Sequence, residues 1–264
     1  RDESESEQVG EKCEGERMTA ARMGAARMTA ARHGRSSVTS SVAPEQRARL
    51  LPDLIAARKI TCTGTTEPDV GSDPRGVKTR VTEDGDELVL NGRKMWISNA
   101  SICDVINVTA AMGRDEKGLA RMARVVVERE RSPFEARETP TLGLRQGHLG
   151  EVLFENCRVP RENLLGQVGD AARVLTLTWL ANRPILGLCA VHMAQRALDA
   201  ALAYAGGRTQ FGGPIGGFQL VQEMLADIAA AVTASRLLCY YALSCIDNGE
   251  RANQVSAMAK RASI

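Results

Sequence analysis

Between residues 60 and 165, short apolar and β-branched runs recur at regular spacing, separated by Gly, Asp, Asn and Pro. Several such runs bounded by turn residues predict the strands of a sandwich or barrel. We expect Asn91-Gly92 to form a hairpin turn between two of these strands. The predicted strands are Thr61–Thr66, Val77–Val81, Glu87–Leu90, Lys94–Ile97, Val105–Ala111, Arg121–Val127 and Glu151–Phe154.

From Asp170 onward the apolar spacing becomes helical. We expect Pro184 to interrupt or kink the first helix, because proline removes a backbone donor. The predicted helices are Asp170–Cys189, Ile185–Ala205, Phe218–Asn248 and a last one that begins at Asn253. The pattern therefore predicts an α+β protein, with an antiparallel β-sandwich or barrel domain followed by an incomplete C-terminal helical bundle.

The first 42 residues fit neither pattern. An acidic, Ser-rich start is followed by a five-residue repeat of the type Met-Thr-Ala-Ala-Arg, and this period matches neither helix nor strand. We predict that residues 1–42 are low-complexity and disordered. A basic targeting or membrane-surface helix is the less favoured alternative, because the acidic block opposes that use.

The remaining chain divides into three predicted parts. Residues 43–59 form a short helical lead-in that breaks at Pro52, residues 60–168 form the β-domain, and residues 169–264 form a partial helical domain. A length of 264 residues suits one large domain or two ordinary ones. Aromatic residues make up 3% of the chain, so we expect a core of Leu, Val, Ile and Ala.

Composition narrows the possible partners and location. A net charge of +2 without a basic, aromatic-rich run disfavours nucleic acid. The seven cysteines are scattered without a Cys-x-x-Cys pair, so reduced thiols in a cytoplasmic protein are expected. No apolar run approaches the roughly 20 residues of a membrane span, and no secretory leader is evident. His33, His148 and His192 are isolated, which argues against a metal site.

One stretch carries turn chemistry that is suited to ligand binding. Thr66–Asp73 spells Thr-Glu-Pro-Asp-Val-Gly-Ser-Asp, and Lys94–Asn99 spells Lys-Met-Trp-Ile-Ser-Asn. Pro and Gly let such a loop expose backbone N–H groups, and a neighbouring Trp suits a flat aromatic ring. The alternative is an ordinary hairpin in which Glu67 and Asp73 are turn and cap residues, and we assign them those structural roles.

This stretch resembles the flavin-binding signature of the acyl-CoA dehydrogenase family. A second match to the family begins at Arg208-Thr-Gln-Phe-Gly-Gly-Pro-Ile and continues from Phe218 to Asp227. The resemblance extends from about Ala43 to the C-terminus. It implies an FAD-dependent oxidoreductase of fatty acid metabolism that forms an enoyl thioester from an acyl-CoA or acyl-carrier-protein thioester. It also implies an electron-transfer flavoprotein or other acceptor, and a homo-oligomer, dimer or tetramer.

The resemblance also implies roles for individual residues. Thr65 and Thr66 would hydrogen-bond the flavin ring, Trp96 would cover one face, and Ser98 would approach N5. The alternative for Trp96 is a buried core indole. A second FAD cluster would reach the cofactor of a neighbouring subunit, and its residues are Arg208, Gln210, Phe211, Phe218 and Gln219. For Arg208 the alternative is a helix-end residue that bonds the last carbonyls.

Substrate contacts implied by the family are Ser72, near the thioester, and Leu180, Asn182 and Arg183 on a helix. Of these helix residues, Arg183 matches the family. No catalytic base is assigned. In most relatives the catalytic Glu comes from a late helix, which would lie beyond Ile264, and in a minority it occupies the position of Asn182, which cannot abstract a proton.

We therefore expect a chain that is truncated at both ends and catalytically inactive. A flavin-dependent oxygenase or oxidase on the same fold, or a non-enzymatic fragment or interaction module, are the alternatives. Apolar helix faces after Asp170 are expected to be exposed and to favour association.

Overall fold

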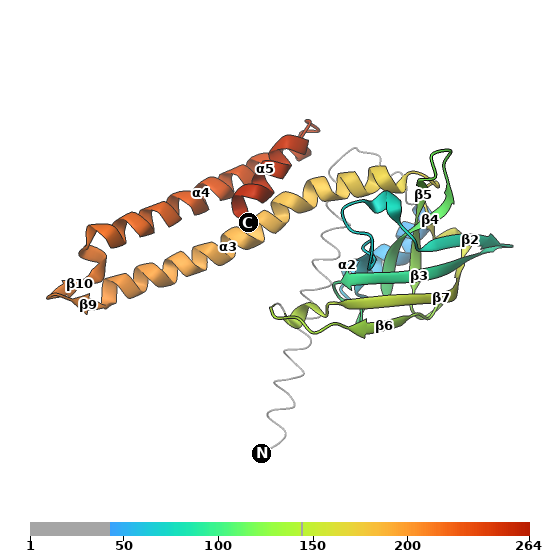
Figure 1. The fold of residues 1–264 in the computed structure, drawn as a ribbon, viewed down its shortest axis with the longest axis horizontal. Helices are drawn as coiled ribbons and strands as arrows, with labels where there is room; N and C mark the ends of the chain where they lie inside the picture. Colours follow the sequence, from blue (N-terminus) through green and yellow to red (C-terminus); the bar gives the residue numbers. More distant parts are fainter. Residues whose placement is uncertain (1–42, 144) are drawn as a thin grey trace, which may run out of the picture. The chain divides into compact units, whose positions relative to one another are not determined.

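The computed structural model describes residues 43–143 and 145–264. The described residues fall into two compact units, one ending at Leu175 and the other running from Thr176 to Ile264 (Figure 1). A β-rich unit followed by helices confirms the predicted α+β class. The predictions for residues 1–42 lie outside the described residues.

The β unit contains one large sheet. Its strands run in the order β6-β7-β3-β2-β4-β5-β8, and β1 pairs with β4. The strands are β1 Thr61–Gly64, β2 Arg80–Asp84, β3 Glu87–Ile97, β4 Val105–Arg114, β5 Ala120–Glu128, β6 Glu135–Glu138, β7 Gly150–Pro160 and β8 Leu164–Leu165. Most pairs are antiparallel as predicted, but β1 and β2 pair with β4 in parallel, because the chain passes through the β2–β3 hairpin before it returns as β4.

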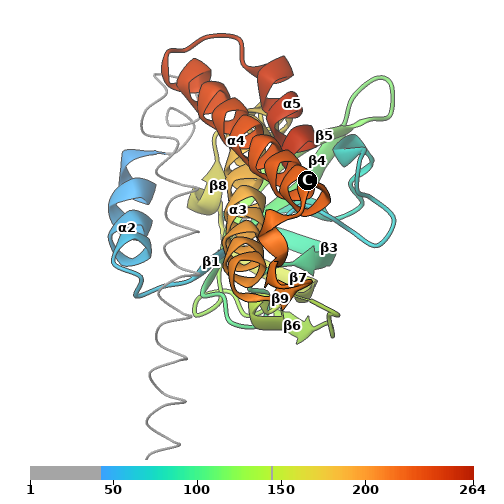
Figure 2. The same cartoon turned by 90° about the vertical axis from the view of Figure 1, so that its left-hand side faces the viewer.

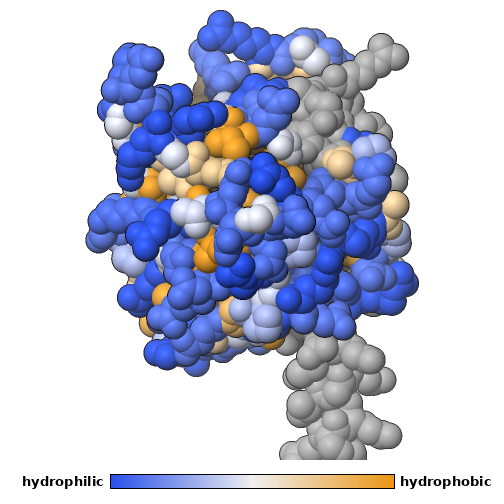
Figure 3. Space-filling model, turned by 90° about the vertical axis from the view of Figure 1, so that its right-hand side faces the viewer, coloured by the Kyte–Doolittle hydropathy of each residue, from blue (hydrophilic) through white to orange (hydrophobic). Residues whose placement is uncertain are grey.

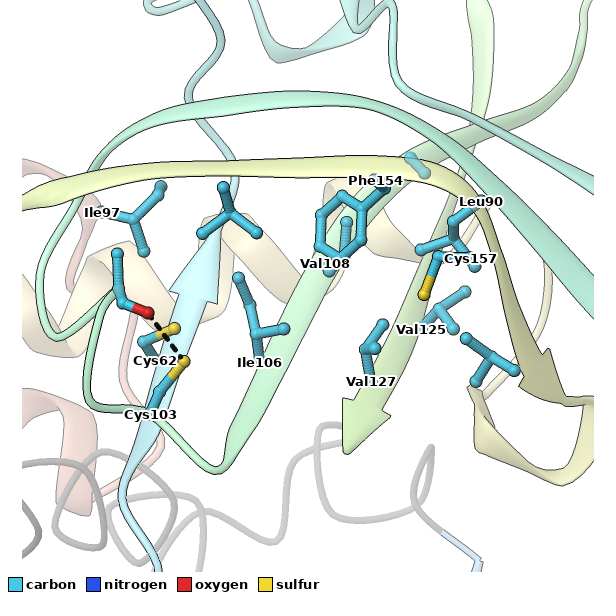
Figure 4. Close-up of a cluster of buried hydrophobic side chains, with 14 of the residues drawn as sticks. Cys62, Leu90, Ile97, Cys103, Ile106, Val108, Val125, Val127, Phe154 and Cys157 are labelled. Atoms are coloured by element: carbon cyan, nitrogen blue, oxygen red, sulfur yellow. Dashed lines mark hydrogen bonds between the residues drawn. The ribbon is translucent and has the colours of Figure 1, made fainter. Parts of the chain in front are cut away.

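The sheet folds over an aliphatic core. In Figure 4, Ile97, Leu90 and Phe154 from β3 and β7 face side chains from β4 and β5, among them Ile106 and Val125. All five are at most 3% exposed. The prediction of an aliphatic core is confirmed, and burial of this apolar surface supplies the main stabilisation of the unit, about 25 cal/mol for each Å².

The outer face of β4 and β5 is covered at its two ends. At one end, Leu50 and Leu54 of helix α2 (Pro44–Ile55) pack with residues of β4 and β5. At the other end, Ala171 packs with Met122. The predicted break at Pro52 is wrong, because Pro52 lies inside α2. It falls in the last turn of the helix, where its missing N–H removes a single helical bond.

Asn91-Gly92 is not a turn, so that prediction is wrong. Strand β3 runs continuously from Glu87 to Ile97, with a register shift against β7 between Leu90 and Gly92. Gly92 has a φ of 152°, and a Cβ there would lie 2.5 Å from Thr79 Oγ1. The glycine permits this close approach. The turn between β2 and β3 contains Gly85 instead, with a φ of 60°.

The second unit is helical. Helix α3 (Ala171–Gly207) is followed by the short strands β9 (Thr209–Gln210) and β10 (Gly213–Pro214), then by α4 (Gln219–Asp247) and α5 (Asn253–Ser263). Figures 1 and 2 show α3, α4 and α5 side by side. Helix α3 continues through Pro184 as one helix, so two predicted segments are joined. The Ser256 hydroxyl donates to the Leu180 carbonyl at 2.6 Å and ties α5 to α3.

The helical unit exposes apolar side chains, as predicted. The largest include Met193, Leu202, Tyr204, Leu220, Met224, Leu237 and Tyr241. By length and composition alone, α3 and α4 are each apolar enough to cross a membrane, in contrast to the sequence expectation. Core helices of other proteins pass the same test, so this is weak support for a membrane span. The side of the molecule shown in Figure 3 is mostly hydrophilic, with apolar residues gathered on part of it.

Replacing Gly92 by Ala tests the close approach of β3 to Thr79. We expect Gly92→Ala to lower the free energy of unfolding by at least about 2 kcal/mol, because strain at positive φ adds to a steric clash. Gly118 also has positive φ, 75°, but its Cβ would meet no atom within 4 Å. Gly118→Ala should therefore cost only about 1 kcal/mol. Equal losses in urea unfolding would contradict the role of the close approach.

Candidate functional site

The loop after β1 and the end of β3 are held together by hydrogen bonds to the backbone carbonyls of the loop. The Met95 N–H donates to the Thr66 carbonyl at 2.9 Å, and Lys94 Nζ donates to the Thr65 carbonyl at 3.2 Å. These bonds place Thr65 and Thr66 beside the strand that carries Trp96. All four residues assigned to the flavin ring by resemblance, including Ser98, therefore lie in one region of the β unit.

A buried ion pair fixes this junction. Lys94 is 0% and Glu67 5% exposed, and Lys94 Nζ lies 2.8 Å from Glu67 Oε1. Glu67 also accepts the N–H groups of Lys78 at 2.7 Å and Thr79 at 2.9 Å. The structural role predicted for Glu67 is confirmed. Asp73 likewise caps a 3₁₀ turn by accepting the Arg75 N–H at 3.1 Å.

The ionisation of this pair follows from its burial and its bonds. Burial alone would raise the pKa of the Glu67 carboxyl, but hydrogen bonds from Lys94 and Thr79 outweigh it and hold the pKa below the ordinary 4.5. Burial lowers the pKa of Lys94, and Glu67 offsets part of that effect. Glu67 is thus a charged structural anchor, which leaves it unsuited to act as a proton acceptor.

Trp96 is turned out of the sheet. The pairing of β3 with β7 shifts between Lys94 and Ile97, and such a bulge redirects a side chain. Trp96 has a φ of 59°, an unusual value for a bulky residue, and its side chain is 54% exposed. The alternative of a buried core indole is therefore excluded. A strained, exposed aromatic residue is typical of a ligand site.

The region offers donors beside this flat surface. Among the described residues, neither the Thr66 N–H nor the Ser98 hydroxyl forms a hydrogen bond, and the Thr65 hydroxyl has only Thr109 Oγ1, at 3.4 Å. Ser72 is exposed on the same loop. An indole face next to several polar groups fits an aromatic heterocycle with polar edges, such as the flavin ring.

The residues of the second predicted cluster lie in the helical unit, around β9 and β10. Phe211 and Phe218 form an edge-to-face pair with ring centroids 6.0 Å apart, although Phe211 is 97% exposed. The backbone N–H of Arg208 donates to the Tyr204 carbonyl at 2.8 Å. Within the described chain, no carboxylate pairs with the exposed Arg208 side chain. Gln210 and Gln219 are also exposed.

The predicted substrate residues on α3 are partly buried. Leu180, Asn182 and Arg183 lie within one turn of the helix. Arg183 lines a hollow of about 350 Å³ together with Lys260 and Arg261. Ala257 and Ile264 also line it, so this hollow is largely apolar with three basic residues at its border. The structure thus assembles the predicted residues in two groups, one in each unit.

The roles of two residues of the β unit are not evident from the sequence. Lys94 is part of a motif, but its burial is visible only in the fold. The second is Arg124 on β5, whose Nε donates to Asn107 Oδ1 at 3.1 Å. Burial lowers the pKa of Arg124 to about 10. The alternation of Met122, Arg124 and Val126 would have placed this arginine on a covered face.

Contrary to the prediction, His148 is not isolated. Its Nδ1 lies 2.6 Å from Glu138 Oε1, and the Ser101 hydroxyl donates to the same oxygen at 2.6 Å. The Ser101 bond and the His148 contact lower the pKa of Glu138. The described residues include no cluster of three or more His, Cys, Asp or Glu side chains that could hold a metal ion.

Two family models match the chain. The acyl-CoA dehydrogenase middle domain matches residues 62–157, and the acyl-CoA dehydrogenase C-terminal domain matches residues 172–263. The matches cover both groups of predicted site residues.

Individual proteins agree with this assignment. The chain is 37% identical over 217 residues to a glutaryl-CoA dehydrogenase of Desulfococcus multivorans, covering 82% of this chain and 56% of that protein. Butyryl-CoA dehydrogenase from Megasphaera elsdenii superposes with a TM-score of 0.81 at 28% identity, covering 86% of this chain and 59% of that one. The prolyl acyl carrier protein oxidase AnaB gives a TM-score of 0.79 at 27% identity, covering 86% and 60%. The chain thus spans about half the length of the curated relatives it matches.

A double-mutant cycle tests the buried ion pair. We expect Lys94→Met to lower the free energy of unfolding by about 3–5 kcal/mol, because it leaves the Glu67 carboxylate buried without its partner. Adding Glu67→Gln should recover part of the loss, since the uncompensated charge is then removed.

The exposed pair Lys78–Asp69, with N···O of 2.7 Å, is the matched control. Lys78→Met should change stability by no more than about 1 kcal/mol. Additive losses from the two substitutions at Lys94 and Glu67 would show that the pair is not coupled.

Proposed function

Because the chain belongs to the acyl-CoA dehydrogenase family, we propose that it binds FAD and serves the α,β-dehydrogenation of an acyl thioester on CoA or an acyl carrier protein. The observation that supports this most directly is the junction of the Thr65–Thr66 loop with the bulged strand that exposes Trp96. That junction combines an aromatic wall with donors whose bonds are not used within the fold.

In this proposal, Trp96 packs on the flavin ring, while Thr65, Thr66 and Ser98 bond its polar edge. Bound FAD supplies a hydride acceptor. The exposed guanidinium of Arg208 suits a pyrophosphate, since its planar fork pairs with two oxygens at once. Gln210, Phe211, Phe218 and Gln219 complete that second cluster, which reaches the cofactor of a neighbouring subunit. The protein is then a homo-oligomer, and the exposed apolar residues of α3 and α4 support association.

The substrate residues are Ser72 in the β unit and Leu180, Asn182 and Arg183 on α3. Removal of the α-proton needs a base, and the amide of Asn182 cannot accept a proton. The side chains of Arg183, Lys260 and Arg261 could pair with the phosphates of an anionic carrier such as CoA. We place the protein in the cytoplasm, with an electron-transfer flavoprotein or a similar acceptor as its partner.

A flavin-dependent oxidase is the second candidate. Its support is the likeness to AnaB, which is named as an acyl carrier protein oxidase. The two functions share the flavin site and differ in whether reduced flavin passes its electrons to a protein acceptor or to oxygen. Consumption of oxygen after flavin reduction by an acyl thioester would favour the oxidase.

Flavin binding is tested by titrating the purified chain with FAD while recording visible absorption and tryptophan fluorescence. The chain has only two tryptophans, so each can be followed in a single variant. We expect a protein-bound flavin spectrum and quenching that is weakened more in Trp96→Phe than in Trp179→Phe, because the proposal packs Trp96 on the ring. A protein that is colourless once free FAD has been removed would overturn the proposal and favour a non-enzymatic role.

The role of Asn182 is tested by supplying a carboxylate at its position. We expect anaerobic addition of an acyl-CoA to bleach the flavin band at least about 10-fold faster in Asn182→Glu than in the unchanged chain, because general-base catalysis contributes roughly 10²–10⁴-fold. Asn182→Gln, which has the same length and no charge, is the control. Equal bleaching rates in both variants would show that residue 182 does not face the α-carbon.

A further inference from the structure

The outer face of β4 and β5 is apolar at its ends and polar in the middle. Between the parts covered by α2 and by Ala171 lie Asn107, Thr109 and Arg124. Asn107 is 6% and Thr109 0% exposed, and Arg124 is partly buried. Asn107 accepts a hydrogen bond from Arg124, and the Thr109 hydroxyl lies near that of Thr65, so the side-chain partners of this group among the described residues are all neutral.

The charge of Arg124 is not balanced. Its Nε bonds the neutral Asn107, and no carboxylate of residues 43–143 or 145–264 forms an ion pair with it. The same face offers a contrast in Arg49, whose guanidinium pairs with Glu128 and donates to Asn163 Oδ1 at 2.6 Å. Arginine remains protonated in proteins, so Arg124 cannot escape the cost of burial by losing its charge.

Arg124 lies beside the proposed flavin site. It is the direct cross-strand partner of Thr109, so the two side chains share a face. The Thr109 hydroxyl is in turn 3.4 Å from that of Thr65. We propose that Arg124, held in place by Asn107 and Thr109, binds the distal carboxylate of a dicarboxylic acyl thioester.

The choice of a carboxylate rests on the proposed function. Dehydrogenation requires the acyl carbons to lie at the flavin ring, and the Thr65 end of the site is where that ring is placed. An anion bound there belongs to the acyl group, because the phosphates of CoA lie at the other end of the thioester and the pyrophosphate of FAD is assigned to Arg208. The planar guanidinium pairs with both oxygens of a carboxylate, and the apolar surroundings accept the methylene chain.

The test measures binding of two thioesters to the FAD-loaded chain by calorimetry. Glutaryl-CoA carries the carboxylate, and hexanoyl-CoA is an uncharged analogue of comparable length. We expect glutaryl-CoA to bind at least about 10-fold more tightly, as a charge-assisted hydrogen-bond pair provides. Arg124→Gln should abolish this ratio, and Arg124→Lys should retain part of it.

Arg121→Gln is the matched control, because Arg121 lies on the same strand and is exposed. It should leave the ratio unchanged, and thermal melts verify that each variant is folded. Equal binding of both thioesters by the unchanged chain would overturn the inference while retaining the proposed function. An equal loss of both affinities in Arg124→Gln would assign Arg124 to the CoA moiety instead. Binding of neither thioester would overturn both.

Discussion

The buried pair of Lys94 and Glu67 is the constraint on which the candidate site depends. Glu67 belongs to the loop after β1, while Lys94 lies at the bulge of β3, so one contact joins segments that are 27 residues apart. Glu67 also accepts two backbone N–H groups that lead into β2, and Lys94 donates to the Thr65 carbonyl. A charge pair at this depth contributes little net stability by itself. Its effect is to allow only one arrangement of the loop, because any other leaves a charge or a backbone donor without a partner.

That arrangement has a consequence for Trp96. Strand β3 cannot slide along β7, because the ion pair with Glu67 fixes Lys94. The extra residue of the bulge is therefore accommodated at Met95 and Trp96. The strained backbone and the exposed indole follow from the same register shift. Strain of this kind persists where neighbouring contacts determine it. Here those contacts are the Met95–Thr66 backbone bond and the Lys94–Glu67 pair, so the geometry of the proposed ring site is set before any ligand arrives.

The sequence predicted the order of strands and helices well, because alternation and helical spacing record which face of each element is covered. It failed where the composition of a short stretch does not decide its conformation. Asn91-Gly92 has the composition of a hairpin turn, yet Gly92 is required by the approach of Thr79, which precedes the partner strand β2. Pro52 was predicted to end α2, but its place in the last turn makes it tolerable. The loop and the exposed indole followed from a family motif, whereas the roles of Lys94 and Arg124 depend on burial, which composition does not reveal.

Two charged residues on the covered face of β5, Glu128 and Arg124, differ in whether the fold supplies a partner of opposite charge. Glu128 is paired with Arg49, and Asn163 satisfies both, so that end of the strand is complete within the fold. Arg124, two positions along the same face from Val126, has only a neutral amide. An apolar residue at this position, like its neighbours Met122 and Val126, would avoid the cost of burying an unpaired charge. The proposed anionic ligand would supply the charge partner that the fold does not give this guanidinium beside Thr109 and Thr65. The same logic separates Glu67 from a catalytic base, since its carboxylate is already fully engaged by three donors.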